Sequence, residues 1–185
     1  MLPPAAHYMP NYVDEACELA LLHAIDNSAW LGDLKRRVQH YGFRYDYRAR
    51  RVTDESRLGP LPDWLEVLAG RLWKDSIFQA QPDQVIVNEY LPGQGIAPHV
   101  DCEPCFGETI ASLSLGSACL MDFSNIHSGN TATQVLAPRS LLVLSGEARF
   151  NWTHGIPARK SDVIDGKKIA RGRRVSLTFR TVITK

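Results

Sequence analysis

The sequence lacks an apolar run long enough to cross a membrane, and its start lacks a basic segment followed by an apolar one. We therefore expect neither a membrane partner nor a secretory leader. Only four cysteines are present, and without an export signal they indicate a reducing, cytoplasmic compartment in which thiols stay free or bind metal. The 185 residues contain no repeat, low-complexity tract or linker, which favours a single domain, and we expect a monomer.

The sequence also has little net charge, only +1, which by itself argues against a nucleic-acid partner. That total hides two basic segments. Lys35–Arg51 holds seven basic residues against one acid, and Arg159–Arg174 holds seven against two acids. Because local charge decides whether a surface attracts phosphates, a nucleic-acid partner remains open.

The composition, 44% hydrophobic and 22% charged, is that of a folded globular protein. Helical spacing of apolar residues predicts two early helices, one over 13–24 and one over 61–72. After Pro82 the chain turns to short β-prone runs separated by Gly, Pro and Asn. We expect a mainly β fold with flanking helices, a sandwich or jelly roll. The predicted strands are Gln84–Tyr90, Ile96–Asp101, Ile110–Leu115, Cys119–Phe123, Gln134–Leu136, Ser140–Leu144, Phe150–His154 and Arg174–Val182.

Two metal-site patterns overlap in the stretch APHVDCEPCFGE. On an extended chain His99 and Asp101 point to one side, which suits a site of imidazole and carboxylate ligands. The other pattern is a C-x-x-C formed by Cys102 and Cys105. A structural zinc site needs two further ligands, but the sequence has no second C-x-x-C and no H-x-x-x-H. We therefore interpret the cysteine pair as incidental.

A third ligand has two candidates downstream. His127 lies in the turn-rich SNIHSGN, whereas His154 follows the alternating FNW and precedes Gly155. We prefer His154, because two histidines and one carboxylate with open positions are typical of non-haem Fe(II) oxygenases. The alternative is that these polar residues are unrelated, since an isolated H-x-D is common.

Two arginines and two neutral polar residues accompany this pattern. Arg174 and Arg180 are six residues apart in RRVSLTFR and so share one face of a strand. Inward arginines need anions, and a dicarboxylate matches two guanidinium groups, although one arginine at a strand end facing solvent is the alternative. Asn88 and Tyr90 share one face of the strand that leads to His99.

Together, N-x-Y-x-P-G-x-G-x-x-x-H-x-D, a distant His and R-x-x-x-x-x-R resemble the AlkB family of Fe(II)/2-oxoglutarate dioxygenases, over Asn88–Arg180. The resemblance implies a double-stranded β-helix (jelly roll) over 84–182, preceded by helices and a nucleotide-recognition lid within 1–80, in one domain of 185 residues. It implies that O2 is a co-substrate, and that decarboxylation of 2-oxoglutarate is coupled to hydroxylation of a substrate C–H bond.

The resemblance also implies the roles of individual residues. The iron ligands would be His99, Asp101 and His154. Asn88 and Arg180 would hold the 1-carboxylate of 2-oxoglutarate, and Tyr90 and Arg174 its 5-carboxylate. Ser176 stands where the bacterial founder of the family has Asn, and it still offers one hydrogen bond.

The substrate class has two interpretations. Family members that repair nucleic acids carry H-x-D-x-D or H-x-D-x-E, in which the last acid contacts the polar edge of the flipped base. Glu103 completes the second form, and we expect it on the inward face with His99 and Asp101. We therefore predict oxidative dealkylation of N-methyl or etheno bases in DNA or RNA. The flanking stretches, such as RSLLVLSGEAR and WTHGI, are similar to the homologue that hydroxylates modified wobble uridines in tRNA, so this is the alternative. A protein hydroxylase or demethylase, or a catalytically silent binding module, is disfavoured by the lid and the intact triad.

The predicted lid alternates aromatic and basic side chains, which suits base stacking beside phosphates. The alternative is a hairpin whose aromatics lie in the core. The residues that we expect to contact substrate here are Tyr41, Phe43, Arg44, Tyr45, Tyr47 and Arg48.

Overall fold

Strand β12 (Arg174–Arg180) is buried along its whole length because protein covers both of its faces. Its side chains alternate as the pleat requires. On one face Val175, Leu177 and Phe179 join a hydrophobic core shared with the helices. The other face borders an internal cavity and carries Arg174, Ser176, Thr178 and Arg180. The strand therefore connects the core to the cavity.

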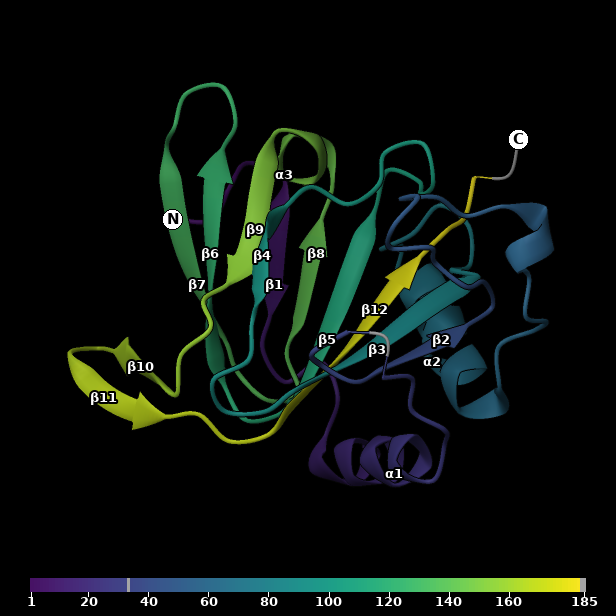
Figure 1. Cartoon of the computed structure of the whole chain (residues 1–185), viewed down its shortest axis with the longest axis horizontal. Helices are drawn as coiled ribbons and strands as arrows, with labels where there is room; N and C mark the ends of the chain where they lie inside the picture. Colours follow the sequence, from purple (N-terminus) through teal and green to yellow (C-terminus); the bar gives the residue numbers. More distant parts are fainter. Residues whose placement is uncertain (33, 184–185) are drawn as a thin grey trace.

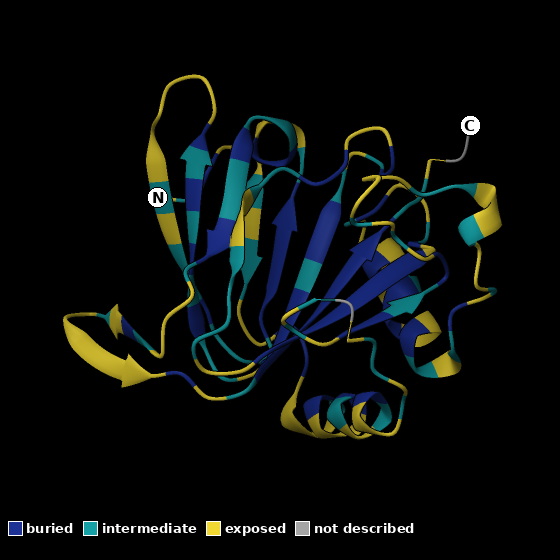
Figure 2. Cartoon of the chain, viewed as in Figure 1, coloured by how far each residue is buried: buried dark blue, intermediate teal, exposed yellow. Residues whose placement is uncertain are grey.

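The computed structural model describes residues 1–32 and 34–183, and it places β12 in the middle of a six-stranded antiparallel sheet (Figure 1). The strand order is β1-β8-β5-β12-β3-β2. Besides β12 these strands are β1 (Ala6–Met9), β2 (Val38–Tyr41), β3 (Gln84–Tyr90), β5 (Ile110–Gly116) and β8 (Leu141–Leu144). Buried residues fill the inner strands, as the dark ribbons of Figure 2 show.

A four-stranded antiparallel sheet closes the other side of the cavity, in the order β4-β9-β6-β7. Its strands are β4 (Ile96–His99), β6 (Cys119–Asn125), β7 (Thr131–Leu136) and β9 (Trp152–Ile156). A two-stranded hairpin of β10 (Ser161–Ile164) and β11 (Lys167–Ala170) projects away from both sheets at the lower left of Figure 1. The two sheets form a jelly roll.

The two long helices pack on the face of the large sheet opposite the cavity. Helix α1 (Glu15–Asp26) begins at Asp14, whose carboxylate accepts a hydrogen bond from the backbone N–H of Cys17 at 2.8 Å. Its Leu21 and Ile25, with Leu65 and Leu72 of α2 (Asp63–Lys74), join the core around Leu177. Helix α3 (Gly146–Phe150) and a 3₁₀ turn at Asp54–Ser56 are short.

The sequence predicted the jelly roll and its two long helices, and eight strands lie near their predicted places. Several boundaries differ: β7 begins at Thr131 instead of Gln134, and β12 ends at Arg180 instead of Val182. Two further differences lie near the cavity. Phe150 ends α3, so the strand begins at Trp152, and β4 stops at His99 before Asp101. The N-terminal part, expected to supply only helices and the lid, also supplies β1 and β2 at the two edges of the large sheet. Edge strands this short lack a clear alternating pattern.

Among the described residues, no helix has the length and apolar character that a membrane span requires.

Replacement of Leu177 by Ala tests the two-faced burial of β12. Leu177 is fully buried in the core under the helices. We expect Leu177→Ala to lower the free energy of unfolding by about 2–5 kcal/mol, through lost burial and the cavity left behind. Val163→Ala, on the exposed hairpin strand β10, should change it by less than about 0.5 kcal/mol. Urea denaturation followed by circular dichroism measures both; equal losses would contradict the packing described.

Candidate active site and metal centre

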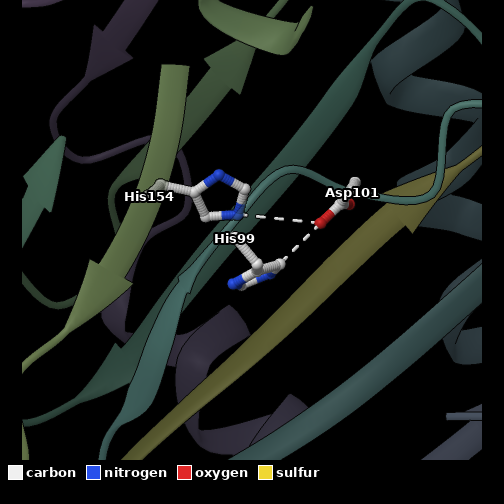
Figure 3. Close-up of side chains that lie close together, drawn as sticks. All are labelled: His99, Asp101 and His154. Atoms are coloured by element: carbon white, nitrogen blue, oxygen red, sulfur yellow. Dashed lines mark ion pairs between the residues drawn. The ribbon is translucent and has the colours of Figure 1, made fainter. Parts of the chain in front are cut away.

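Three side chains converge at the cavity. His99 and His154 come from the smaller sheet, and Asp101 comes from the loop that follows β4. The ligand atoms of His99, Asp101 and His154 all lie within 4.8 Å of one another. His99 on β4 and His154 on β9 are direct cross-strand partners, which fixes their spacing. The Nε2 atoms of His99 and His154 lie 3.4 and 3.7 Å from Asp101 Oδ1, as Figure 3 shows. Two imidazoles and one carboxylate around one point form the ligand set of mononuclear non-haem Fe(II).

The Asp101 carboxylate stays ionised although it is buried. Burial raises the pKa of a carboxyl group, but Arg180 Nε donates to Asp101 Oδ2 at 2.7 Å and the two imidazoles face Oδ1. Together these neighbours hold the pKa of Asp101 well below its ordinary value. The group is therefore an anionic ligand at neutral pH.

Both histidine rings have a nitrogen lone pair available to a metal. Burial lowers the pKa of His154 to about 4, so its ring is neutral at physiological pH. The Nδ1 atom of His99 donates to the Ala97 carbonyl oxygen at 2.8 Å, which leaves Nε2 for a metal.

Arg174 has buried donors without acceptors. Its Nη2 donates to Ser114 Oγ at 2.8 Å, while Nε and Nη1 have no partner among the described residues. Buried charged donors are costly when unpaired, so an anion is required here. A carboxylate oxygen fits, because an ionised acceptor forms strong hydrogen bonds with the donors of a guanidinium group. Tyr90, whose ring centroid lies 5.3 Å from the Arg174 guanidinium carbon, borders the same space.

Arg180, at the other end of β12, already has hydrogen-bond partners. It donates to Asp101 and, through Nη1, to Gln84 Oε1 at 3.3 Å. Ser176 and Asn88 lie between the two arginines as cross-strand partners. Arg180 therefore orients the carboxylate of the metal site; its predicted contact with the 1-carboxylate of 2-oxoglutarate, shared with Asn88, stays a prediction.

One cavity of about 340 Å³ joins these groups. Both sheets and the segment 34–50 line it, and its walls include the three metal-site residues together with Asn88, Tyr90, Arg174, Ser176 and Arg180. The space suits a small dicarboxylate beside a metal, with room toward the open side for part of a substrate.

Comparison with known proteins agrees with this chemistry. Residues 22–180 match the 2OG-Fe(II) oxygenase superfamily. The chain is 39% identical to the "Alkylated DNA repair protein ALKBH8 homolog" of Arabidopsis thaliana, over 97% of its own length and 58% of the relative. The chain belongs to the AlkB family of Fe(II)/2-oxoglutarate oxygenases.

Other AlkB-family relatives extend the comparison. The chain is 36% identical to the "tRNA (carboxymethyluridine(34)-5-O)-methyltransferase alkbh8" of Xenopus tropicalis, over 98% of its own length but only 32% of the relative. It is 28% identical to the "Probable RNA/DNA demethylase ALKBH6" of Danio rerio, over 97% of its length and 86% of the relative. The chain thus spans about a third to three fifths of its ALKBH8 relatives.

The fold also matches solved structures of this superfamily. The structure of OsALKBH1 superposes with a TM-score of 0.75 at 17% identity, covering 98% of each chain. This likeness concerns the double-stranded β-helix alone. It is the family match over residues 22–180, together with the His99, Asp101 and His154 cluster, that identifies the chain as a dioxygenase using Fe(II) and 2-oxoglutarate.

The four predicted lid aromatics divide into two pairs. Tyr41 packs edge-on against Trp64 of α2, and Phe43 is buried under the Arg57 guanidinium. Tyr45 and Tyr47 instead line the cavity and contact each other edge-on at 5.0 Å. The same two tyrosines also line an outer groove with Arg44 and Arg48. Only the second pair faces a space that a substrate can enter.

Two other predicted residues lie apart from the triad. Glu103 was expected on the inward face with His99 and Asp101, but it is exposed in the turn that follows the end of β4. Its predicted contact with substrate stays a prediction. His127 is exposed in the β6–β7 turn, which agrees with the choice of His154.

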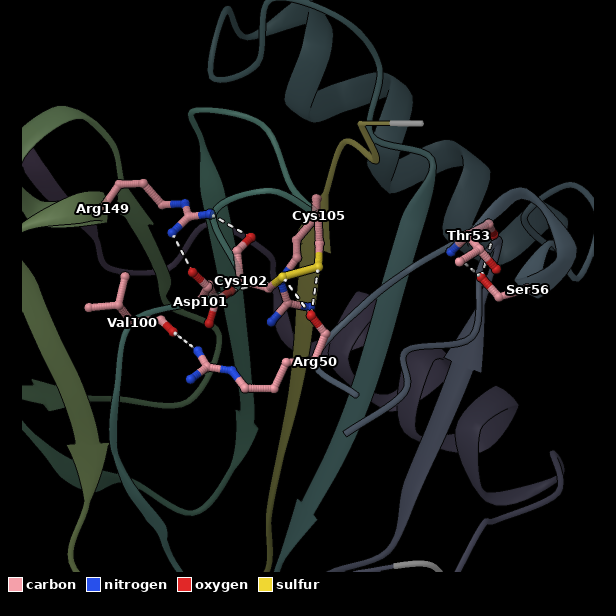
Figure 4. The surroundings of a disulfide bond; sticks show 9 residues. Arg50, Thr53, Ser56, Val100, Asp101, Cys102, Cys105 and Arg149 are labelled. Atoms are coloured by element: carbon pink, nitrogen blue, oxygen red, sulfur yellow. Dashed lines mark hydrogen bonds and ion pairs between the residues drawn. A yellow bond between two sulfur atoms is a disulfide. The ribbon is translucent and has the colours of Figure 1, made fainter. Parts of the chain in front are cut away.

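Cys102 and Cys105 form a disulfide, which corrects the expectation of free and incidental thiols. Both are buried, and Cys102 lines the cavity rather than facing away from it. Their sulfur atoms lie 3.1 and 3.4 Å from the carbonyl oxygen of Arg50, while Arg50 Nη2 donates to the Val100 carbonyl oxygen at 3.2 Å (Figure 4). The disulfide therefore closes the loop after Asp101 on itself, and the hydrogen bond from Arg50 to Val100 connects this loop to the predicted lid.

Arg149 is a supporting residue that sequence reasoning missed. It is buried on α3 and donates to the carbonyl oxygens of Asp101 at 3.0 Å and Cys102 at 3.2 Å (Figure 4). The backbone of the metal-binding loop is thereby held from behind. In the sequence, Arg149 only ends the stretch RSLLVLSGEAR, shortly after an apolar run. Nothing in that stretch indicates its distant hydrogen-bond partners.

Paired histidine variants test the metal centre. His154→Ala removes one ligand, and we expect Fe(II) affinity and succinate formation to fall by more than about 100-fold. His127→Ala, at an exposed turn, should leave both within about twofold of the parent chain. Iron titration and a succinate assay measure the effect; equal losses in the two variants would rule out His154 as the third ligand.

Neutralisation of Arg174 tests the cosubstrate site. Arg174→Gln removes the charge behind the two unpaired donors, and a hydrogen bond to a charged group contributes about 1.5–3 kcal/mol. We expect the Kd for 2-oxoglutarate to rise roughly tenfold to a hundredfold. Lys168→Gln, exposed on β11, is the matched control. Calorimetric titration with 2-oxoglutarate would contradict the assignment if the two variants bound it equally well.

Proposed function

We propose that this dioxygenase hydroxylates a modified uridine at the wobble position of tRNA. What carries the proposal is the 36–39% identity, over nearly the whole chain, to ALKBH8 relatives, of which the Xenopus protein is named for carboxymethyluridine at position 34 of tRNA. The named demethylase relative matches at only 28% identity. The proposal therefore favours the second interpretation of the sequence over base dealkylation.

The position of Glu103 supports the same preference. The dealkylation hypothesis depended on an acid that reaches the flipped base from the inward face beside Asp101. Glu103 instead lies exposed in a turn, outside the residues that line the cavity. The predicted contact of Glu103 with a flipped base therefore gains no support from the lining of the cavity.

The lid provides a suitable entrance for an anticodon loop. Bases in such a loop are already unpaired, so placing one in a pocket costs less than extruding it from a duplex. Tyr45 and Tyr47 offer aromatic faces where the cavity meets the outer groove, and Arg44 and Arg48 line that groove. Aromatic and cationic side chains in this combination stack bases and contact phosphates.

The proposed role of each residue in the site follows from its contacts. When bound, Fe(II) and 2-oxoglutarate supply the oxidation of a substrate C–H bond by O2, with release of succinate and CO2. Asp101 stays anionic because Arg180 pairs with it, and His154 stays neutral because it is buried. Arg174 orients the cosubstrate through its free donors, and the tyrosines hold the base at the open side.

A substrate panel tests this function. We expect an anticodon stem–loop with carboxymethyluridine at position 34 to gain one oxygen atom and to raise succinate formation by at least about tenfold over the stem–loop with plain uridine. Mass spectrometry of the nucleosides and a succinate assay provide the measurements. Release of formaldehyde from methylated DNA or RNA oligonucleotides, without oxygen gain in the stem–loop, would establish the dealkylation alternative instead.

A further inference from the structure

The β10–β11 hairpin carries positive charge that the active site does not use. Arg159 and Arg171 pair with the buried carboxylate of Asp162 at 2.7 and 2.6 Å, which fixes the base of the hairpin. Three lysines of this segment are exposed and, among the residues that the structure describes, form no ion pair: Lys160, Lys167 and Lys168. The tip adds one exposed acid, Asp165. The hairpin therefore keeps an excess of positive charge for an anionic partner.

The turn between β3 and β4 connects this hairpin to the other basic segment of the chain. The Gly93 N–H donates to the Arg159 carbonyl oxygen at 3.2 Å, and a methyl group placed on Gly93 would lie 3.8 Å from Lys160 Cγ. In the other direction, Gln94 Nε2 donates to the Lys35 carbonyl oxygen at 3.0 Å. Lys35 and Lys160, far apart in the sequence, thus lie on two sides of one short turn.

This turn lies beside the cavity. Leu34 and Arg36, which directly flank Lys35, both line the cavity, and so does Ile96, two residues after Gln94. Strands β4 and β2 that adjoin these segments are edge strands of the two sheets, so strand pairing does not close the jelly roll between them. The exposed lysines around the turn are therefore neighbours of the space that a base would occupy.

Two adjacent lysines of β11 lie on opposite faces of the hairpin. Lys167 is the cross-strand partner of Ile164 and shares its face, and Asp162, two residues earlier, lies on that face as well. Asp162 points toward the sheets, because its carboxylate accepts the Leu120 N–H at 3.1 Å. Lys167 therefore lies on the face turned toward the body of the protein, and Lys168 lies on the face turned away from it.

We propose that Lys35, Lys160 and Lys167 form a phosphate-binding surface, the lysine rim, that holds the backbone of the anticodon arm while the wobble base occupies the cavity. The inference rests on the proposed function, which supplies the RNA. An ammonium group on a flexible side chain contacts phosphates without reading the bases. The lysine rim thus positions the arm, and the cavity recognises the base.

The salt dependence of binding tests the lysine rim. The Kd of a fluorescent anticodon stem–loop is measured by anisotropy at several salt concentrations, with Fe(II) and 2-oxoglutarate and without oxygen. We expect the double variant Lys160→Gln and Lys167→Gln to raise the Kd at least about fivefold at low salt. The slope of log K against log salt should fall by about 1.5, since each lost phosphate contact removes about 0.7–0.9. Adding Lys35→Gln should raise the Kd further.

A second double variant is the matched control. Lys74→Gln and Lys168→Gln remove the same charge from the exposed end of α2 and from the outer face of β11. We expect the Kd to stay within about twofold of the parent chain and the slope to stay unchanged. Equal losses in the two double variants would overturn the proposal, because a general effect of charge does not depend on the face. An unchanged Kd in the first would overturn it too.

Substrate length provides a second readout. A trinucleotide centred on carboxymethyluridine lacks the arm, so it reaches the cavity without the lysine rim. The first double variant should lower kcat/KM for the stem–loop at least about fivefold and change kcat/KM for the trinucleotide by less than about twofold. Equal losses on both substrates would contradict the proposal, because the lysines would then act on the cavity or on folding.

The surface and the function fail separately. If the stem–loop gains an oxygen atom but binds the first double variant as well as the parent chain, the function stands and the lysine rim is wrong. If the stem–loop binds through the lysine rim, with or without the modification at position 34, but gains no oxygen, the surface stands and the proposed hydroxylation is wrong.

Discussion

The ion pair between Asp101 and Arg180 is the contact on which the site depends. A buried carboxylate alone would take up a proton and cease to be a good ligand, but the 2.7 Å contact with Arg180 Nε keeps it charged. Burying both charges is tolerable only because each has further partners. Asp101 faces two imidazoles, and Arg180 also donates to Gln84. The pair also links the small sheet to the large one, since Asp101 follows β4 and Arg180 ends β12.

The pleat of β12 places that pair on the same face as Arg174, the predicted contact of the cosubstrate. Because alternate residues share a face, Arg174 and Arg180 both reach the cavity while Leu177 anchors the strand under the helices. Pairing with β3 places Asn88 opposite Ser176 and Tyr90 opposite Arg174. Arg180, the partner of Asp101, and Arg174 thus lie at a fixed separation on one strand. A shift of its register by one residue would turn both arginines into the core.

This dependence explains which parts of the site could be predicted from sequence. Side-chain directions on regular strands follow from a period of two, so the inward arginines were predictable. His154 was preferred over His127 from its place at the end of a predicted strand, but the pairing of its strand with that of His99 is known only from the fold. Glu103 was misplaced because the strand ends at His99, and beyond it the period no longer applies. The disulfide was missed because the prediction used the expected compartment of the protein, whereas the turn after Cys102 brings the two sulfur atoms together. Arg149 and Arg36 contact residues about fifty positions away, and no local pattern announces such partners.

Three arginines that line the cavity, and Arg149 behind the loop after β4, differ mainly in the hydrogen-bond partners that their nitrogens already have. Arg149 donates to backbone carbonyl oxygens and so stabilises the loop after β4. Arg180 donates to Asp101 and Gln84 and so orients the Asp101 carboxylate. Arg174 has one partner and two buried free donors, and Arg36 has one partner and an open end. Since a buried guanidinium without partners attracts an anion, the two free donors of Arg174 mark the place in the cavity where an anion is stabilised most. Arg36 is only partly buried, so water can still reach its free donors.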